Sequence, residues 1–352
     1  MKKLLILTLV SLILASCAQV SSSINPANSG LIPNLGGKPV AEDTASPSSG
    51  LPNFDHIVLI LLESRDYSSV IGNLQMPQIN ALAINNALLS NYYAVTHPNL
   101  PNTIALMSGS TQGITSNCTD CFINQPNLAN EIEASGRTWK AYLESMPAPC
   151  FLGNQGEYVQ SHNPLLYFDS IRLDATRCDR SLVPLTNLNS DLANNQLPNF
   201  SLIIPNECNS GQTCSDAIVD KWAGDMVAKL QASPALGTNS LIVVAFDQGS
   251  AASTQGCCGM TLPAGGKVAV VVISPSALPD ITDNTLYSHY SLLKTILIAW
   301  NLPLLGQTVD AATQPITSPW VGLSGLPFSP NPPSQASPTP ASLAPFTSTS
   351  TP

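Results

Sequence analysis

Residues 54–62 read Phe-Asp-His-Ile-Val-Leu-Ile-Leu-Leu and are followed by Glu63, and residues 240–246 read Ser-Leu-Ile-Val-Val-Ala-Phe and are followed by Asp247. Both are short aliphatic runs without polar alternation, which is typical of strands that are buried on both faces of a parallel sheet. Ligands of such sheets bind beyond the carboxyl ends of the strands. The acids that follow the two runs therefore predict a site at this edge, where carboxylate oxygens could hold a metal ion.

The chain around these two runs alternates between segments with strand and helix patterns. We expect further strands over residues 139–143, 200–204 and 268–273, and helices over 77–89, 100–107, 128–135, 216–231 and 289–300. Alternation of this kind predicts an α/β fold with a mostly parallel central sheet and helices on both faces.

The first seventeen residues have the pattern of a lipoprotein signal peptide. Lys2 and Lys3 precede an apolar run that is too short to span a membrane, and the run ends in Leu-Ala-Ser before Cys17. This is the bacterial lipobox pattern, in which the cysteine is lipidated; the alternative is an ordinary signal peptide with an incidental cysteine. We therefore expect Cys17 to anchor the chain to the membrane by lipid, outside the cytoplasm, at the outer membrane or cell surface.

Composition divides the rest of the chain into three parts. Residues 18–52 are rich in Ser, Pro, Asn and Gly and predict a flexible tether. Residues 53–322 carry the strand and helix patterns and predict one folded domain. Residues 323–352 are dominated by Pro, Ser and Thr, and such a segment cannot bury enough apolar surface to fold.

The charge balance excludes some partners. The formal net charge is −9, and only 10% of the residues are charged. A nucleic-acid-binding protein needs a basic surface that neutralises phosphates, so we expect no nucleic-acid partner. Electrostatic docking on anionic lipid is disfavoured for the same reason.

Eight of the nine cysteines remain once Cys17 is set aside. An even number outside the cytoplasm indicates disulfides. The simplest pairs are Cys118–Cys121 and Cys208–Cys214, with Cys150–Cys178 next, while Cys257 and Cys258 form either a vicinal bridge or two separate bridges. The alternative for Cys118-x-x-Cys121 is a zinc site, but no second pair of similar spacing accompanies it.

Seven segments together resemble one family. They include HPNLPNTIALMSG at residues 97–109 and LIVVAFDQG at 241–249, and the others are residues 54–67, 139–150, 162–168, 197–208 and 289–306. In this order they resemble the phosphoesterase family that contains acid phosphatases and phosphocholine-type phospholipases C, within the alkaline-phosphatase superfamily. The resemblance implies an alkaline-phosphatase-like fold and metal-assisted attack on a phosphate ester or phospholipid headgroup.

The resemblance also implies roles for individual residues. Glu63 and Asp247 match metal ligands, with Ser64 and Gln248 where the family has Asn and Glu. Asn99 stands at the position of the Ser or Thr nucleophile, and an amide cannot supply an alkoxide. A divalent ion (Mg, Ca, Mn or Zn) held by two acids alone would be weakly bound, because the affinity for the ion decreases as the number of charged ligands decreases.

Three polar residues of the family pattern remain. The resemblance implies that Asn102 binds phosphate and that His162 and His289 act on the leaving group or the phosphate. Each also has a structural alternative: Asn102 satisfies backbone groups at a helix start, His162 belongs to a turn, and His289 is a polar anchor in the core. Near the missing nucleophile, the hydroxyls that could replace it are those of Thr96, Thr103 and Ser108.

Two functions of different class therefore stand. The first is a surface-anchored, metal-dependent phosphoesterase whose catalysis is weakened or lost by the substitutions. The second is a non-catalytic protein that binds a phosphorylated ligand, a glycan or a protein on the same scaffold. Residues 209–213 favour the second, since they lack the acids and the histidine that the family often carries there.

Overall fold

The computed structural model describes residues 50–321. The lipobox with Cys17, residues 18–49 of the expected tether and the expected tail over 323–352 lie outside the described residues. Within residues 50–321, no helix is long and apolar enough to cross a membrane.

The expected strands and helices are present, together with several short elements. The strands are β1 His56–Leu62, β2 Ala87–Tyr93, β3 Trp139–Leu143, β4 Leu182–Pro184, β5 Phe200–Ile204, β6 Ser240–Phe246, β7 Lys267–Ile273, β8 Ile281–Asp283 and β9 Tyr287–Ser288. The α-helices are α1 Tyr67–Val70, α2 Pro77–Asn85, α3 Asn99–Ser108, α4 Leu128–Ala134, α5 Asp169–Arg172, α6 Ala175–Ser181, α7 Asn187–Ala193, α8 Glu207–Ser210, α9 Asp216–Gln231, α10 His289–Ala299 and α11 Ser318–Val321. The 3₁₀ turns are η1 Gln160–His162, η2 Pro164–Tyr167, η3 Pro234–Leu236 and η4 Gly306–Val309.

In the described part of the chain, all strands belong to one sheet. Their order is β4-β3-β5-β1-β6-β7-β2-β8, and β9 pairs with β2. The five neighbouring strands β4, β3, β5, β1 and β6 run parallel to one another. Strand β7 runs antiparallel to both of its neighbours, β6 and β2. The sheet is therefore mostly parallel, as expected.

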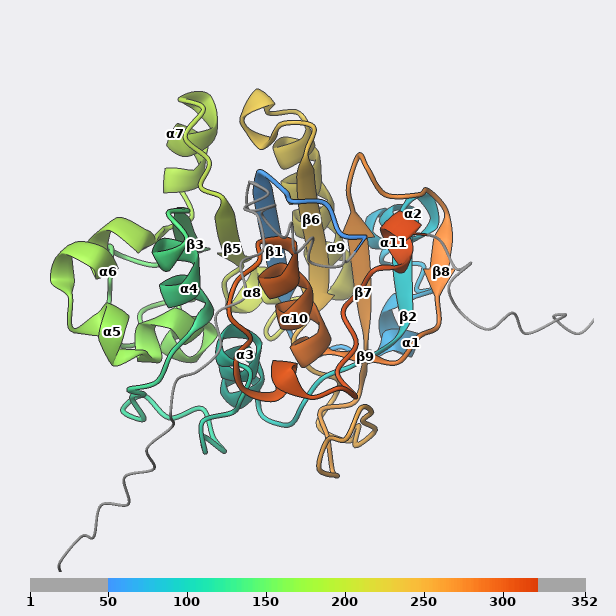
Figure 1. The fold of residues 1–352 in the computed structure, drawn as a ribbon, viewed down its shortest axis with the longest axis horizontal. Helices are drawn as coiled ribbons and strands as arrows, with labels where there is room; N and C mark the ends of the chain where they lie inside the picture. Colours follow the sequence, from blue (N-terminus) through green and yellow to red (C-terminus); the bar gives the residue numbers. More distant parts are fainter. Residues whose placement is uncertain (1–49, 322–352) are drawn as a thin grey trace, which may run out of the picture. The chain divides into compact units, whose positions relative to one another are not determined.

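Helices cover both faces of this sheet (Figure 1). Helices α3, α4 and α10 lie on one face, and α2 and α9 pack together on the other. The central strands are buried accordingly: every residue of β5 and β6 is buried, as is every residue of β1 after His56. The aliphatic runs lack polar alternation because neither face of these strands meets water. The expectation of helices on both faces is confirmed.

The expected helix over residues 77–89 is too long. Helix α2 ends at Asn85, where Asn86 is extended, and residues 87–93 form strand β2. Leu88 and Leu89 fit the helical pattern, but they pair with β7 and β8, and the backbone hydrogen bonds of the sheet override local periodicity. The short strands β4, β8 and β9 also lack a signal that sequence reasoning could use.

Four disulfides cross-link the loops within residues 50–321. They are Cys118–Cys121, Cys150–Cys178, Cys208–Cys214 and the vicinal pair Cys257–Cys258. The three expected pairs are confirmed, and of the two alternatives for the adjacent cysteines the vicinal bridge is observed. Because Cys118 and Cys121 are joined to each other, their thiolates are not available to bind zinc.

Candidate functional site

The site begins where β1 and β6 end side by side. Leu62 pairs with Phe246, and the Asp247 N–H donates to the Leu62 carbonyl at 2.9 Å. Glu63 and Asp247 therefore leave the sheet together. The next residue, Ser64, has a positive φ of 44° and turns its own N–H toward Asp247 Oδ1 at 2.9 Å. Strand register alone thus brings together the two acids that the sequence singled out.

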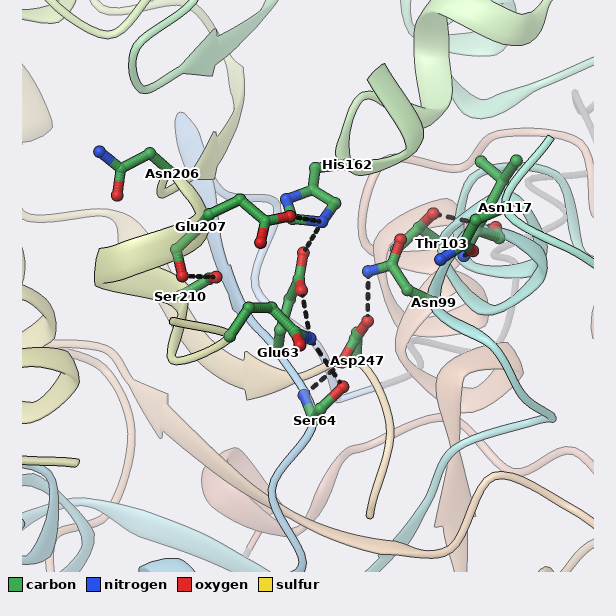
Figure 2. Close-up of polar contacts among 12 residues, drawn as sticks. Glu63, Ser64, Asn99, Thr103, Asn117, His162, Asn206, Glu207, Ser210 and Asp247 are labelled. Carbon is green, nitrogen blue, oxygen red and sulfur yellow. Dashed lines mark hydrogen bonds and ion pairs between the residues drawn. The ribbon is translucent and has the colours of Figure 1, made fainter. Parts of the chain in front are cut away.

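Asn99, the first residue of α3, binds the second carboxyl oxygen of Asp247. Its Nδ2 donates to Asp247 Oδ2 at 2.5 Å, as Figure 2 shows. This amide orientation suits the ionised form of Asp247, because the opposite assignment would point a carbonyl oxygen at a carboxylate. Asn99 Oδ1 is then buried without a hydrogen-bond partner. The residue at the nucleophile position is thus bound directly to the expected metal ligand.

His162 lies across the pocket from Asp247. Its Nε2 is 2.7 Å from Glu63 Oε1 and 3.5 Å from Glu207 Oε1 (Figure 2). The 2.7 Å pair is close enough for an ion pair, but its atoms are not aligned as a hydrogen bond, and Glu63 Oε1 is buried without a hydrogen-bond partner. The imidazole therefore bridges two acids that follow two neighbouring strands, β1 and β5.

Burial and mutual repulsion determine the protonation of these groups. Burial, followed by repulsion from Glu63, raises the pKa of Asp247 to about 7, although the N–H donors of Ser64 and Asn99 oppose the shift. Burial alone would lower the pKa of His162, but the negative charges of Glu63, Glu207 and Asp247 outweigh it and raise this pKa. Burial also raises the pKa of Glu207.

Two glutamines occupy the space between the acids and Ser64. Gln212 Nε2 donates to Glu63 Oε2 at 2.7 Å and to Ser64 Oγ at 3.1 Å. Gln248 Nε2 donates to the same hydroxyl at 2.9 Å, and Gln248 Oε1 lies 2.7 Å from His97 Nδ1. Both lone pairs of Ser64 Oγ are therefore in use.

This donor set does not fit a tightly held divalent cation. Mg²⁺ and Ca²⁺ take six or more oxygen ligands, and Zn²⁺ usually takes four ligands. Of the five residues that the sequence resemblance assigns to metal and nucleophile positions, Ser64 and Gln248 have their oxygens engaged, and Asn99 presents an N–H to Asp247. Among residues 50–321, no group of three His, Cys, Asp or Glu side chains is placed to hold a metal. The amide N–H groups of Asn99 and Gln212 donate to Asp247 and Glu63 respectively.

These residues surround a polar pocket of about 340 Å³. Three of its lining residues, Glu63, His162 and Glu207, are ionisable. Apart from Val159, the others carry amides or hydroxyls: Ser64, Asn99, Asn117, Thr119, Asn154, Ser161, Gln212 and Gln248. None of these lining residues is a lysine or an arginine. The pocket is thus hydrophilic, and its basic group is a single imidazole.

Three of the expected site residues do not line this pocket: Asp247, which lies behind Asn99, and Asn102 and His289. Asn102 Oδ1 accepts from the N–H groups of Val95 and Thr96, and its Nδ2 donates to the carbonyls of Thr96 and Pro98. It therefore shapes the turn that leads into α3. This contact set corresponds to the structural alternative, and a role in phosphate binding stays a prediction.

His289 is fully buried beneath the site. Its Nε2 is 2.5 Å from the Asp247 carbonyl, and its Nδ1 is 3.0 Å from the Tyr92 hydroxyl. Burial lowers the pKa of His289 to about 4, so the ring is neutral at neutral pH. A neutral ring that donates to the Asp247 carbonyl and accepts from Tyr92 fixes the end of β6. A direct catalytic role of His289 stays a prediction.

The three hydroxyls that could replace the nucleophile are engaged with backbone. Thr103 donates to the Leu100 carbonyl at 3.0 Å, as expected inside a helix. Ser108 donates to Ile104 at 2.9 Å, and Thr96 lies 3.3 Å from the His97 carbonyl. None of the three lines the pocket.

Sequence reasoning missed Glu207 and Gln212. Glu207 is the first residue of α8, three residues after β5, so it follows the parallel strand that neighbours β1. The signal was an acid after a third aliphatic strand, at the same edge as Glu63 and Asp247. Gln212 had no usable signal, because its position depends on the loop that the Cys208–Cys214 disulfide closes.

The sequence is similar to known phosphatases. Residues 73–303 match the Phosphoesterase family. The chain is 31% identical to phosphatidylinositol-3-phosphatase of Mycobacterium tuberculosis, over 78% of this chain and 85% of that protein. It is 30% identical to an acid phosphatase of Aspergillus fumigatus, over 78% of this chain but only 62% of the length of that protein.

Solved structures share the fold at low sequence identity. The lipoteichoic acid synthase LtaP of Listeria monocytogenes is 11% identical, covers 76% of both chains and has a TM-score of 0.50. A protein from a Bacteroides thetaiotaomicron locus for glycosaminoglycan metabolism is 13% identical, covers 77% of this chain and 82% of its own, and has a TM-score of 0.51. These likenesses concern the fold alone, and the expected alkaline-phosphatase-like α/β fold is confirmed.

The raised pKa of Asp247 predicts a pH dependence of stability. A carboxyl whose pKa rises on folding stabilises the protein below its unfolded pKa and loses that contribution as pH rises through the folded value of about 7. We therefore expect the wild type to lose about 1–3 kcal/mol of unfolding free energy relative to Asp247→Asn between pH 4 and pH 8. Urea unfolding at each pH measures this difference. The matched control is Asp225→Asn at an exposed site, and equal pH profiles for the wild type and Asp247→Asn would contradict the assignment.

Proposed function

The chain belongs to the Phosphoesterase family, and from this premise we propose that it is a cell-envelope lipoprotein in which the hydrolytic site has become a binding pocket. By descent the protein is a hydrolase of phosphate esters. Its present site holds a ligand without turning it over.

One contact carries this proposal: Asn99 Nδ2 donates to Asp247 Oδ2. At the position where the family pattern has the attacking hydroxyl, the side chain is an amide that cannot form a covalent intermediate. The same amide offers an N–H to the acid that the pattern assigns to the metal. A single substitution thus accounts for the loss of both the nucleophile and one open metal position.

The surrounding substitutions support the same direction. The glutamines at 212 and 248 give N–H donors to Glu63 and Ser64, so neutral groups offset the acids in place of a cation. The pattern has an acid where Gln248 stands, so the site also lost a formal charge that would hold a metal. What remains is a folded, polar pocket without a formed metal site.

A second candidate is an active phosphoesterase. The names of the similar proteins favour it, because they include acid phosphatases and a phosphatidylinositol-3-phosphatase. A phosphate ester or phospholipid headgroup would then be the substrate, with a divalent metal recruited from solution. Against it stand the engaged hydroxyls of Thr96, Thr103 and Ser108.

Reversion of the site tests the proposal. We expect a protein that starts after Cys17 to show no metal-dependent hydrolysis of an aryl phosphate monoester or diester with Mg²⁺, Ca²⁺, Mn²⁺ or Zn²⁺ between pH 5 and pH 9. The triple variant Ser64→Asn, Asn99→Ser, Gln248→Glu should gain activity, because it restores the nucleophile and two metal positions.

The matched control carries Asn99→Ala with the same two other substitutions. It has the restored metal positions without the hydroxyl, and we expect the serine variant to exceed it by on the order of a thousandfold in kcat. Metal-dependent turnover by the natural protein would show that catalysis is retained and would overturn the proposal.

We further propose that lipid on Cys17 holds the domain at the bacterial envelope, outside the cytoplasm. The support is the sequence alone: the basic start, the apolar run and the Leu-Ala-Ser-Cys that ends it. The polar segment over residues 18–52 would then connect the lipid anchor to the folded domain and separate the domain from the membrane.

Substitution of Cys17 tests the anchor. In bacteria that express the full chain and are fed labelled palmitate, we expect the wild type to incorporate label and to fractionate with membranes. Cys17→Ser should incorporate none, because the hydroxyl does not accept the lipid. Ser16→Ala is the matched control and should stay labelled. Persistent labelling of Cys17→Ser would contradict the proposal.

A further inference from the structure

We propose that the pocket binds a small hydrophilic molecule through a protonated amine, and that it does not bind a phosphate. This inference rests on the proposed function, because it names the ligand class of the same non-catalytic pocket. The ligand would place its ammonium group at the pocket floor, among Glu63, Asn99 and Glu207.

The first observation is that the unsatisfied groups at the floor are acceptors. Asn99 Oδ1 is buried without a hydrogen-bond partner, and Glu63 Oε1 has only the His162 imidazole, which lies 2.7 Å away and is not aligned as a hydrogen bond. Both residues line the pocket with at most 3% of their surface exposed. A buried acceptor without a partner costs free energy that a donating ligand recovers. The dianion of a phosphate monoester has only acceptor oxygens, so it cannot donate to either group, whereas an ammonium group has N–H donors for both.

The second observation is the sign of the charge. One imidazole, on His162, faces three acids, Glu63, Glu207 and Asp247. Two of these acids, Glu63 and Glu207, line the pocket, and the His162 imidazole is the one basic side chain beside them. None of the residues that line it is a lysine or an arginine. An anion would meet like charge in a partly buried space, and a cation would meet opposite charge.

The rim indicates what the rest of the ligand looks like. Asn117 Oδ1 accepts from the Leu100 N–H at 3.0 Å, and Asn154 Oδ1 accepts from the Gln160 N–H at 2.8 Å. Because their oxygens are engaged, these exposed rim amides present their NH₂ groups as donors. Donors at the rim suit hydroxyl oxygens, so an amine that also carries a hydroxyl matches both levels of the pocket.

Four probes separate the properties of the ligand. Ethanolamine carries an N–H cation and a hydroxyl, ethylene glycol carries hydroxyls without charge, choline carries charge without an N–H, and inorganic phosphate is the anion. With the protein after Cys17 at pH 7, saturation-transfer NMR titrations should show that ethanolamine binds at least about tenfold more tightly than each of the others.

Variants of the acids test the location. We expect Glu63→Gln and Glu207→Gln each to weaken ethanolamine binding about tenfold, because each removes a negative charge from the pocket. Glu207 is the partly exposed partner, so its variant decides the question if Glu63→Gln does not fold. Glu131→Gln removes an equal charge outside the pocket and should leave binding unchanged.

Several outcomes would overturn the inference: equal binding of ethylene glycol or choline, tighter binding of phosphate, no binding of ethanolamine, or ethanolamine binding that Glu207→Gln leaves intact. These outcomes are distinct from failure of the proposed function. Turnover of an aryl phosphate by the natural protein would defeat the non-catalytic assignment, whereas absence of both turnover and ethanolamine binding would defeat only the choice of ligand.

Discussion

The hydrogen bond from Asn99 to Asp247 is the contact on which the rest of the site depends. It joins the start of α3 to the end of β6, and it gives a buried carboxyl an N–H donor. A buried carboxylate without compensation is costly, and in a metal-dependent hydrolase a cation supplies that compensation. In this protein Asn99 Nδ2 and the Ser64 N–H donate to Asp247, and our proposal is that these donors take the place of the cation.

The same contacts bear on the protonation of the site. Amides stabilise a carboxylate less than a divalent cation does, so burial and the neighbouring Glu63 still raise the pKa of Asp247 to about 7. The excess negative charge in turn raises the pKa of His162. The His162 imidazole thus offsets part of the negative charge of Glu63 and Glu207. Asn99 Oδ1 is left as a buried acceptor at the floor of the pocket.

Much of this architecture can be predicted from the sequence, and the elements and residues that could not be predicted have physical reasons. The aliphatic runs before Glu63 and Asp247 predict adjacent buried strands, and parallel register then places the two acids together. Strand β2 could not be predicted from local sequence, because Leu88 and Leu89 also fit a helical pattern and their strand conformation depends on pairing with β7. Gln212 and Glu207 meet Glu63 and His162 only through folding of the loop after β5. Asn102 and His289 have the residue types of a catalytic site, but their contacts are with backbone and core.

The metal content of the folded protein tests the central claim most directly. The natural protein after Cys17 would be dialysed against Mn²⁺ or Zn²⁺, passed through a desalting column and analysed by mass spectrometry, beside the variant Ser64→Asn, Asn99→Ser, Gln248→Glu. If amides have replaced the cation, the natural protein retains far less than one metal ion per chain and the variant retains close to one. Retention of one ion per chain by the natural protein, lost on Asp247→Asn, would contradict the account.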